Sequence, residues 1–139
     1  MQLTTSRLQQ QFQFIVEIDK LKNVLRQTLL IDQSRRENDA EHSWHLAMMA
    51  IVLSEYADPK VNIARVLIMV LIHDLVEIDA GDTFCYDAQG VNDQAEREQK
   101  AAERLFGLLP EDLGKDLRSL WEEFESKQSI DAQFATALD

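Results

Sequence analysis

Residues that turn or cross-link a chain are scarce in this sequence of 139 residues, which contains four glycines, two prolines and one cysteine. So few glycines and prolines argue against an all-β fold, which needs many turns, and favour long helices. The single cysteine, Cys85, excludes an internal disulfide and a zinc site built from thiolates, and we interpret it as a small loop residue. A lone thiol fits a reducing compartment, so we expect a cytoplasmic protein.

Basic residues are also few: 14 stand against 25 acidic residues, which gives a net charge of −11. A surface of this charge repels a polyanion, so we expect no binding of extended DNA or RNA. A small phosphate ligand is still compatible with this charge, because it needs only a local cluster of positive charge or a metal ion.

Long apolar runs are absent as well. The first residues, MQLTTSRLQQQFQF, contain no apolar segment of the kind found in signal peptides. The longest apolar run, residues 61–72, is too short to span a bilayer and includes Asn62 and Arg65. We therefore expect no membrane partner for this chain.

Apolar residues recur at three- and four-residue spacing along most of the sequence, which is typical of amphipathic helices. They predict an all-α fold, with one domain over residues 1–139 that forms a bundle of about six helices. The third helix, over residues 62–78, is apolar nearly all round and is expected at the centre of the bundle.

The inward residues of the first two helices can be predicted from the same spacing. The first helix is expected to bury Leu8, Phe12, Ile15, Ile18, Leu21 and Leu25, and the second, over residues 40–56, to bury Trp44, Ala47, Met48, Ile51 and Tyr56. A polar loop, DQSRREND, separates them. A charged fourth helix is expected over residues 92–106, and two further helices follow from Pro110 and from Ser129.

Three ionisable residues stand at the end of the most apolar segment, LIMVLIHDLVEIDAGD, residues 67–82. His73, Asp74 and Glu77 fall within about one turn, and burial of such groups is costly unless they are paired or bind a metal. Neighbouring positions on a helix point about 100° apart. The His73 and Asp74 side chains can therefore converge on one point only near the end of a helix.

A metal site needs more ligands than this pair, and the chain has three histidines, His42, His45 and His73. His42 lies near the start of the second helix and can face His73 if the second and third helices pack together. Considered alone, the His73-Asp74 pair fits equally well a core histidine that bonds Asp74 or Glu77. His45, three residues after His42, is interpreted as a residue that packs against His42 or orients it.

The ordered set of motifs resembles a known family. E-H-S-W is followed by an apolar run that ends in I-H-D-L-x-E, and G-D follows after a short turn. R-R-E-N-D-A-E-H-S precedes them, and L-L-P-E-D-L, L-W-E-E-F-E and D-A-Q-F-A-T-A-L-D come after them. Over about residues 21–139 the chain is similar to the HD-domain metal-dependent phosphohydrolases, and among these to the 5′-deoxynucleotidase-like subgroup.

The resemblance implies a metal held by an H…HD…D set of ligands. Residue by residue, these are His42, His73, Asp74 and Asp139. Asp139 is the last residue of the sequence, whereas family members continue through further helix. We therefore expect that a C-terminal helix or helices of the HD-domain fold are missing from this chain.

The resemblance also implies catalytic roles for Glu77 and Asp82, which would orient the attacking water or move a proton. It implies phosphate binding by Arg26, in L-K-N-V-L-R, and by Arg35, seven residues before His42, since a guanidinium group matches the oxygens of phosphate. Shortly after Arg26 the chain reads Q-T-L-L, without the aromatic residue usual in the family. Two alternatives stay open: Glu77 as the partner of a histidine ligand, and both arginines as solvated surface residues.

Two imidazoles and two carboxylates make a mixed nitrogen and oxygen site for one divalent ion, namely Mn²⁺, Co²⁺, Fe²⁺, Mg²⁺ or Zn²⁺, among which ligand type does not choose. The implied activity is release of phosphate from (deoxy)nucleoside 5′-monophosphates. One alternative is a catalytically degenerate domain that keeps the metal for stability or senses a nucleotide. The other is a structural dimerising bundle, indicated by the exposed face of the charged helix at residues 92–106, so a homodimer is also considered.

Overall fold

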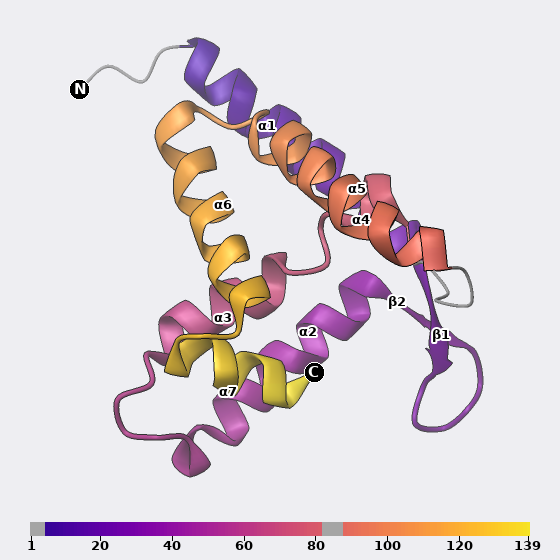
Figure 1. Ribbon diagram of the computed structural model, residues 1–139, viewed down its shortest axis with the longest axis vertical. Helices are drawn as coiled ribbons and strands as arrows, with labels where there is room; N and C mark the ends of the chain where they lie inside the picture. Colours follow the sequence, from indigo (N-terminus) through magenta and orange to yellow (C-terminus); the bar gives the residue numbers. More distant parts are fainter. Residues whose placement is uncertain (1–4, 82–87) are drawn as a thin grey trace.

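The computed structural model describes residues 5–81 and 88–139, and most of them are helical (Figure 1). The α-helices are α1 (Thr5–Ile18), α2 (Asp39–Val52), α3 (Ile63–Ile72), α4 (Glu77–Ala80), α5 (Ala88–Phe106), α6 (Glu111–Ser126) and α7 (Ile130–Leu138). Short 3-10 helices, η1 (Asp19–Asn23) and η2 (Ser54–Tyr56), follow α1 and α2. The predicted all-α class is confirmed. No helix among the described residues is long and apolar enough to cross a bilayer.

A small β-hairpin lies where the sequence predicted the end of the first helix and a polar loop. Strand β1 (Leu25–Leu29) pairs antiparallel with β2 (Arg36–Asn38), with Leu25 opposite Asn38. The helical prediction for Leu25 is therefore wrong. The chain leaves the helical conformation at Val24, and it reverses through a turn in which the Gln33 N–H bonds the Leu30 carbonyl at 2.8 Å. Gln33 adopts a positive φ of 64° in this turn.

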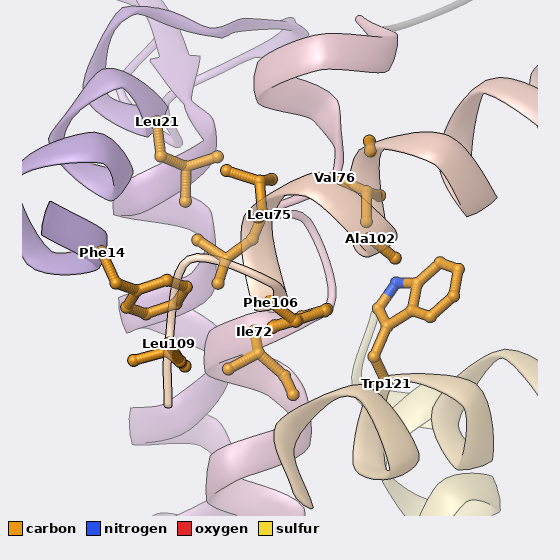
Figure 2. Packing of buried hydrophobic residues seen from close by; sticks show 11 residues of the cluster. Phe14, Leu21, Ile72, Leu75, Val76, Ala102, Phe106, Leu109 and Trp121 are labelled. Carbon is orange, nitrogen blue, oxygen red and sulfur yellow. The ribbon is translucent and has the colours of Figure 1, made fainter. Parts of the chain in front are cut away.

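Helix α3 lies at the centre of the core, as predicted, and contributes side chains to two buried clusters. The first cluster contains Phe14, Leu21, Ile72, Leu75, Val76, Ala101, Ala102, Leu105, Phe106, Leu109 and Trp121. Figure 2 shows Ile72 and Leu75 of this cluster between Phe14 and Trp121. The second cluster contains Leu46, Ala50, Val66, Met69, Val70, Phe124, Ala132 and Ala135. The second cluster packs α2, α3, α6 and α7 together.

The predicted inward faces of the first two helices are largely wrong. Leu8, Phe12 and Ile15 of α1 are exposed, as are Trp44, Met48, Ile51 and Tyr56 of the second predicted helix. Phe14 is buried on α1, and Leu46 and Ala50 are buried on α2. Each helix carries two apolar stripes, so spacing identifies the helix but not the stripe that faces the core. In α2 the stripe with the smaller side chains is buried, which allows close packing against α3.

The predicted third helix is interrupted. Helix α3 ends at Ile72, and α4 begins only at Glu77. Between them the N–H groups of Leu75 and Glu77 bond carbonyl groups three residues back, those of Ile72 and Asp74, at 3.1 and 2.9 Å. Gly81 ends α4 with a positive φ of 73°, a conformation that favours glycine. The break places the His73-Asp74 pair at a helix end.

Candidate metal centre

His73 follows α3 directly and is buried, with 5% of its surface exposed. Its Nδ1 lies 2.6 Å from the Val70 carbonyl oxygen, which can only accept a hydrogen bond. The Nδ1–H therefore donates, so Nε2 is the ring nitrogen available to a metal ion. This Nε2 has no hydrogen-bond partner, yet it lies 3.3 Å from Asp74 Oδ1 and 3.6 Å from Asp139 Oδ2. A metal ion among these atoms would satisfy the buried nitrogen and offset the charge of both carboxylates.

His42 reaches the same point from the first turns of α2. Its Nε2 lies 2.6 Å from Asp139 Oδ1, and its Nδ1 lies 3.3 Å from Glu37 Oε1 at the end of the hairpin. Burial lowers the pKa of His42, but the hydrogen bond with Asp139 contributes to a net rise. Asn38 caps α2 and fixes the position of this first turn, because its side chain accepts from the Glu41 N–H while Glu41 accepts from the Asn38 N–H, both at 2.9 Å.

Asp139 lies at the C-terminal end of α7, beside α2 (Figure 1). Its N–H bonds the Thr136 carbonyl at 3.1 Å, and its carboxylate faces both histidines. The hydrogen bond with His42 lowers the pKa of Asp139 in spite of its burial. Ligand atoms of His42, His73 and Asp139 all lie within 4.8 Å of one another. With the adjacent Asp74, the structure brings together the four residues that the sequence indicated.

A polar network holds α7 against α3 and α6. Arg65 Nη1 donates to Asp131 Oδ2 at 2.6 Å and to Glu123 Oε2 at 3.0 Å. The Asn62 N–H donates to Asp131 Oδ1 at 2.8 Å, and the Ser129 hydroxyl donates to Glu123 at 2.7 Å. Hydrogen bonding to Glu123 and Asp131 raises the pKa of Arg65 further above its usual value, and the bond from Arg65 lowers the pKa of Glu123.

Glu77 lies beside the ligand set, in a second group formed with Asp39 and Asp74. Oxygen atoms of these three carboxyl groups lie within 4.8 Å of one another. Burial, a hydrogen bond with Asp39 and the charge of Asp74 raise the pKa of Glu77 to about 11. Glu77 is therefore protonated near neutral pH while no cation offsets the charge of its neighbours. Asp82, also predicted to be catalytic, lies outside the described residues.

The two predicted phosphate-binding arginines differ in position. Arg26, on β1, brings its Nη1 to 3.7 Å from Asp74 Oδ2 and its Nε to 3.4 Å from Glu37 Oε1. Arg35 instead pairs with Glu41 through both guanidinium Nη atoms, with Nη1 2.8 Å from Oε1. This pairing raises the pKa of Arg35 and helps to lower that of Glu41 to about 2. Both arginines line one cavity of about 660 Å³ that His42 also lines.

The donor set fits a divalent cation. Ligand atoms of His42, His73 and Asp139 form one group, and Asp74 Oδ1 adds a second carboxylate oxygen 3.3 Å from the orphaned Nε2 of His73; no thiolate of the described residues belongs to this group. Mixed nitrogen and oxygen sites of this kind suit several divalent metals, so the donors do not select the ion. The site lies between α2, the end of α3 and the end of α7.

The family model for the HD domain matches residues 18–139. The chain belongs to the HD domain family. A solved structure, described as a "predicted metal-dependent phosphohydrolase" from Magnetospirillum magnetotacticum MS-1, is 62% identical to this HD-domain chain and superposes with a TM-score of 0.88. That comparison covers 96% of this chain and 68% of the solved one.

Two curated relatives are named as 5′-deoxynucleotidases. The human 5′-deoxynucleotidase HDDC2 is 34% identical over 91% of this chain. The Pectobacterium atrosepticum 5′-deoxynucleotidase ECA3034 is 30% identical over 79% of it. The HD-domain chain described here spans 61% of the human protein and 59% of the bacterial one.

Sequence reasoning missed two acidic residues at this centre. Glu37 approaches the Nδ1 of His42, and Asp39 lies against Glu77. Both belong to the stretch predicted to be a polar loop. The pairing of β2 with β1 brings Glu37 to His42. A strand of three residues has no sequence pattern from which it could be predicted. One signal could have identified Glu37: it is an acidic residue five positions before the expected ligand His42. Carboxylates commonly accept a hydrogen bond from the ring nitrogen of a histidine ligand that does not bind the metal.

Proposed function

We propose that this chain carries the catalytic site of a divalent-metal-dependent phosphomonoesterase that releases phosphate from deoxynucleoside 5′-monophosphates. The observation that carries the proposal is the buried, unbonded Nε2 of His73, which lies 3.3 Å from Asp74 and 3.6 Å from Asp139 and shares a group of possible ligands with His42, with Arg26 beside it. The substrate class rests on the two relatives named as 5′-deoxynucleotidases. The proposed resident ion is one of Mn²⁺, Co²⁺, Fe²⁺, Mg²⁺ and Zn²⁺.

The proposed ligands are His42 and His73 through Nε2, and Asp74 and Asp139 through carboxylate oxygen. A bound divalent ion would supply Lewis-acid polarisation of a phosphoryl oxygen and a lowered pKa for water. Val70 and Glu37 orient the two imidazoles, because each contacts the ring nitrogen that faces away from the ligand cluster. This orientation is present before any substrate arrives.

Charge around the centre is divided between elements. The guanidinium of Arg26 comes from β1 of the hairpin, where it also lies 3.4 Å from Glu37 of β2, whereas further acidic groups come from α2, α4, α5, α6 and the end of α7. Partial desolvation and the charge of Asp74 raise the pKa of Glu98. Partial desolvation and the charges of Glu98, Asp74 and Asp139 raise the pKa of Glu125 to about 7, although Glu125 is exposed at the surface. A phosphate dianion is therefore drawn to the Arg26 side of the centre, where a guanidinium can donate to its oxygens.

Glu77 is the proposed proton-transferring group. Its carboxyl lies against Asp39 and Asp74, so it can accept a proton from water once positive charge offsets these neighbours. Asp82 keeps the proposed role of orienting the same water, since it follows α4 closely in the sequence. Phosphoryl transfer needs mainly positioning and charge neutralisation, and this division of groups supports both.

The test begins with protein purified without chelator, whose metal content is measured by elemental analysis. Phosphate release is then measured on deoxynucleoside and ribonucleoside 5′-monophosphates, with and without EDTA. We expect EDTA-sensitive release from the deoxynucleotides. Bound metal without release from any phosphomonoester would contradict the proposal and would favour a degenerate domain that keeps its ion for stability.

A matched pair of histidine variants on α2 strengthens the test. His42→Ala removes a proposed ligand, whereas His45→Ala removes the neighbouring histidine, for which the structure gives no contact with the ligand cluster. We expect His42→Ala to lose the metal and His45→Ala to retain it. Equal metal content in the two variants would contradict the assignment of His42.

A further inference from the structure

The imidazole ring of His73 lies against an aromatic side chain of α6 that the proposed metal centre does not include. The ring centroids of His73 and Phe124 are 4.9 Å apart, and the two ring planes are inclined by 46°. This separation is typical of two aromatic rings in contact. Both residues are buried, so the contact lies away from solvent.

A single hydrogen bond does not hold the His73 ring in one orientation. The Nδ1–H donates to the Val70 carbonyl at 2.6 Å, which fixes one atom of the ring. The χ2 torsion of a histidine is broad, so the ring can still turn about that atom. Such a turn would move Nε2 away from Asp74 and Asp139, which lie 3.3 and 3.6 Å from it. The direction of Nε2 therefore requires a second contact.

We propose that Phe124 is a positioning residue, whose ring fixes the plane of the His73 imidazole so that Nε2 points at the other ligand atoms before a metal ion binds. The inference rests on the metal centre of the proposed function and is independent of the substrate. Phe124 carries no atom that binds a metal. Its removal should nevertheless weaken metal binding, because the metal would then have to order the His73 ring as well.

The backbone of Phe124 is held on both sides. The preceding residue, Glu123, accepts hydrogen bonds from Arg65 at 3.0 Å and from the Ser129 hydroxyl at 2.7 Å. At the end of α6, the Lys127 N–H donates to the Phe124 carbonyl at 3.3 Å. The Phe124 ring is thus presented to His73 by a fixed segment of chain.

The same ring belongs to the packing around the helix that leads to the fourth proposed ligand. Phe124 shares a buried cluster with Ala132 and Ala135 of α7, the helix that ends just before Asp139. Both alanines are fully buried, and their small side chains allow α7 to pack closely on this cluster. Phe124 therefore contacts His73 from within the packing that also holds α7.

The experiment measures Co²⁺ affinity and the visible absorption of the bound ion in matched phenylalanine variants. Phe124→Leu keeps an apolar side chain and removes the ring. Phe106→Leu is the control, because Phe106 is also a buried phenylalanine but lies in the other cluster, where its ring contacts Phe14 (Figure 2). We expect Phe124→Leu to bind Co²⁺ roughly tenfold more weakly, the lower end of the range for residues that orient a metal ligand, with a changed spectrum.

Phe106→Leu should lower the urea midpoint about as much as Phe124→Leu does, and leave Co²⁺ affinity and spectrum as in the wild type. Phe124→Met separates ring from volume, since methionine fills apolar space with a flexible side chain. It should bind Co²⁺ as weakly as Phe124→Leu. Wild-type affinity in either Phe124 variant would overturn the inference, as would an equal loss of affinity in Phe106→Leu.

The orientation of His73 is also measured without metal, by ¹H–¹⁵N correlation spectra of the three histidine rings in EDTA-treated protein. His73→Ala assigns the signals. We expect the Nδ1–H of His73 to exchange slowly with water in the wild type and in Phe106→Leu, and much faster in Phe124→Leu. This result supports the inference even if the wild-type chain binds no Co²⁺, which would count against the proposed function alone. Unchanged exchange in Phe124→Leu would overturn the inference.

Discussion

At the scale of single residues, the carboxyl group of Glu77 is subject to opposing demands. It lies in contact with Asp39 and Asp74, which favour its protonated form, and catalysis requires it to accept a proton. A cation at the adjacent ligand set favours the ionised form, because it offsets the charge of Asp74. The state of Glu77 is therefore expected to depend on metal occupancy.

The first prediction concerns turnover. Glu77→Gln preserves the shape of the side chain but cannot accept a proton, so phosphate release should fall by about 10²-fold or more, the usual scale of general acid–base catalysis. Metal content, measured by elemental analysis, should stay the same. If turnover survives while metal affinity falls, Glu77 acts by orienting a ligand and the proton-transfer role is wrong.

A second prediction concerns the stability of the metal-free protein. The pKa of Glu77 is about 11 in the folded chain, against 4.5 for an ordinary glutamate, so above pH 4.5 the unfolded chain releases a proton that the folded chain retains. The free energy of unfolding should thus fall as pH rises from 5 to 8. Glu77→Gln should lessen this fall, measured as urea midpoints in EDTA.

Glu55→Gln, on the exposed η2, is the control for that measurement. It should reproduce the wild-type dependence on pH. Midpoints that fall by the same amount in wild type and in Glu77→Gln would show that Glu77 is not protonated in the folded, metal-free chain.

At the scale of elements, sequence periodicity predicted the helical class, the central place of α3 and the start of the last helix. It did not identify the buried stripe of α1 or α2. Each of these helices has two apolar stripes, and the buried stripe is the one that packs more closely against the adjacent helices. It also missed the hairpin, since three-residue strands are defined by pairing rather than by composition. The site residues His42, His73, Asp74 and Asp139 came from ordered motifs, whereas Glu37 and Asp39 required the fold.

The third prediction tests how α7 is held. Asp131 is buried and bonds both Arg65 and the Asn62 N–H, so Asp131→Ala should lower the free energy of unfolding by about 1–3 kcal/mol, the cost of leaving such partners unpaired. Because Asp139 lies at the other end of α7, the same change should weaken metal binding. The measurements are urea denaturation and Co²⁺ titration.

Asp112→Ala is the matched control for Asp131→Ala. Asp112 also pairs with an arginine, Arg7, but its side chain is 64% exposed, and exposed pairs contribute little. It should leave both stability and metal affinity close to wild type. Equal effects of the two changes on Co²⁺ affinity would contradict the view that the Asp131 network positions Asp139.

At the scale of the whole molecule, an acidic chain gathers several of its carboxylates around the candidate metal centre and brings the cation of Arg26 to it from the hairpin. With a net charge of −11, the protein is expected to repel polyanions, whereas Arg26 and the proposed divalent ion would attract a small phosphate locally. The cytoplasmic location that the sequence predicts stays a prediction, and the homodimer stays a possibility that the sequence raised. Sedimentation velocity at several protein concentrations is the measurement that decides the oligomeric state.

The most direct test of the metal centre is a titration of Co²⁺ into metal-free wild-type protein and into His73→Ala, followed by calorimetry and by the visible absorption of the ion. The wild-type chain should bind one equivalent with a spectrum typical of nitrogen and oxygen ligands, and phosphate release should rise in step with occupancy. His73→Ala should bind no stoichiometric ion and release no phosphate. Full stoichiometry with an unchanged spectrum in His73→Ala would contradict the account.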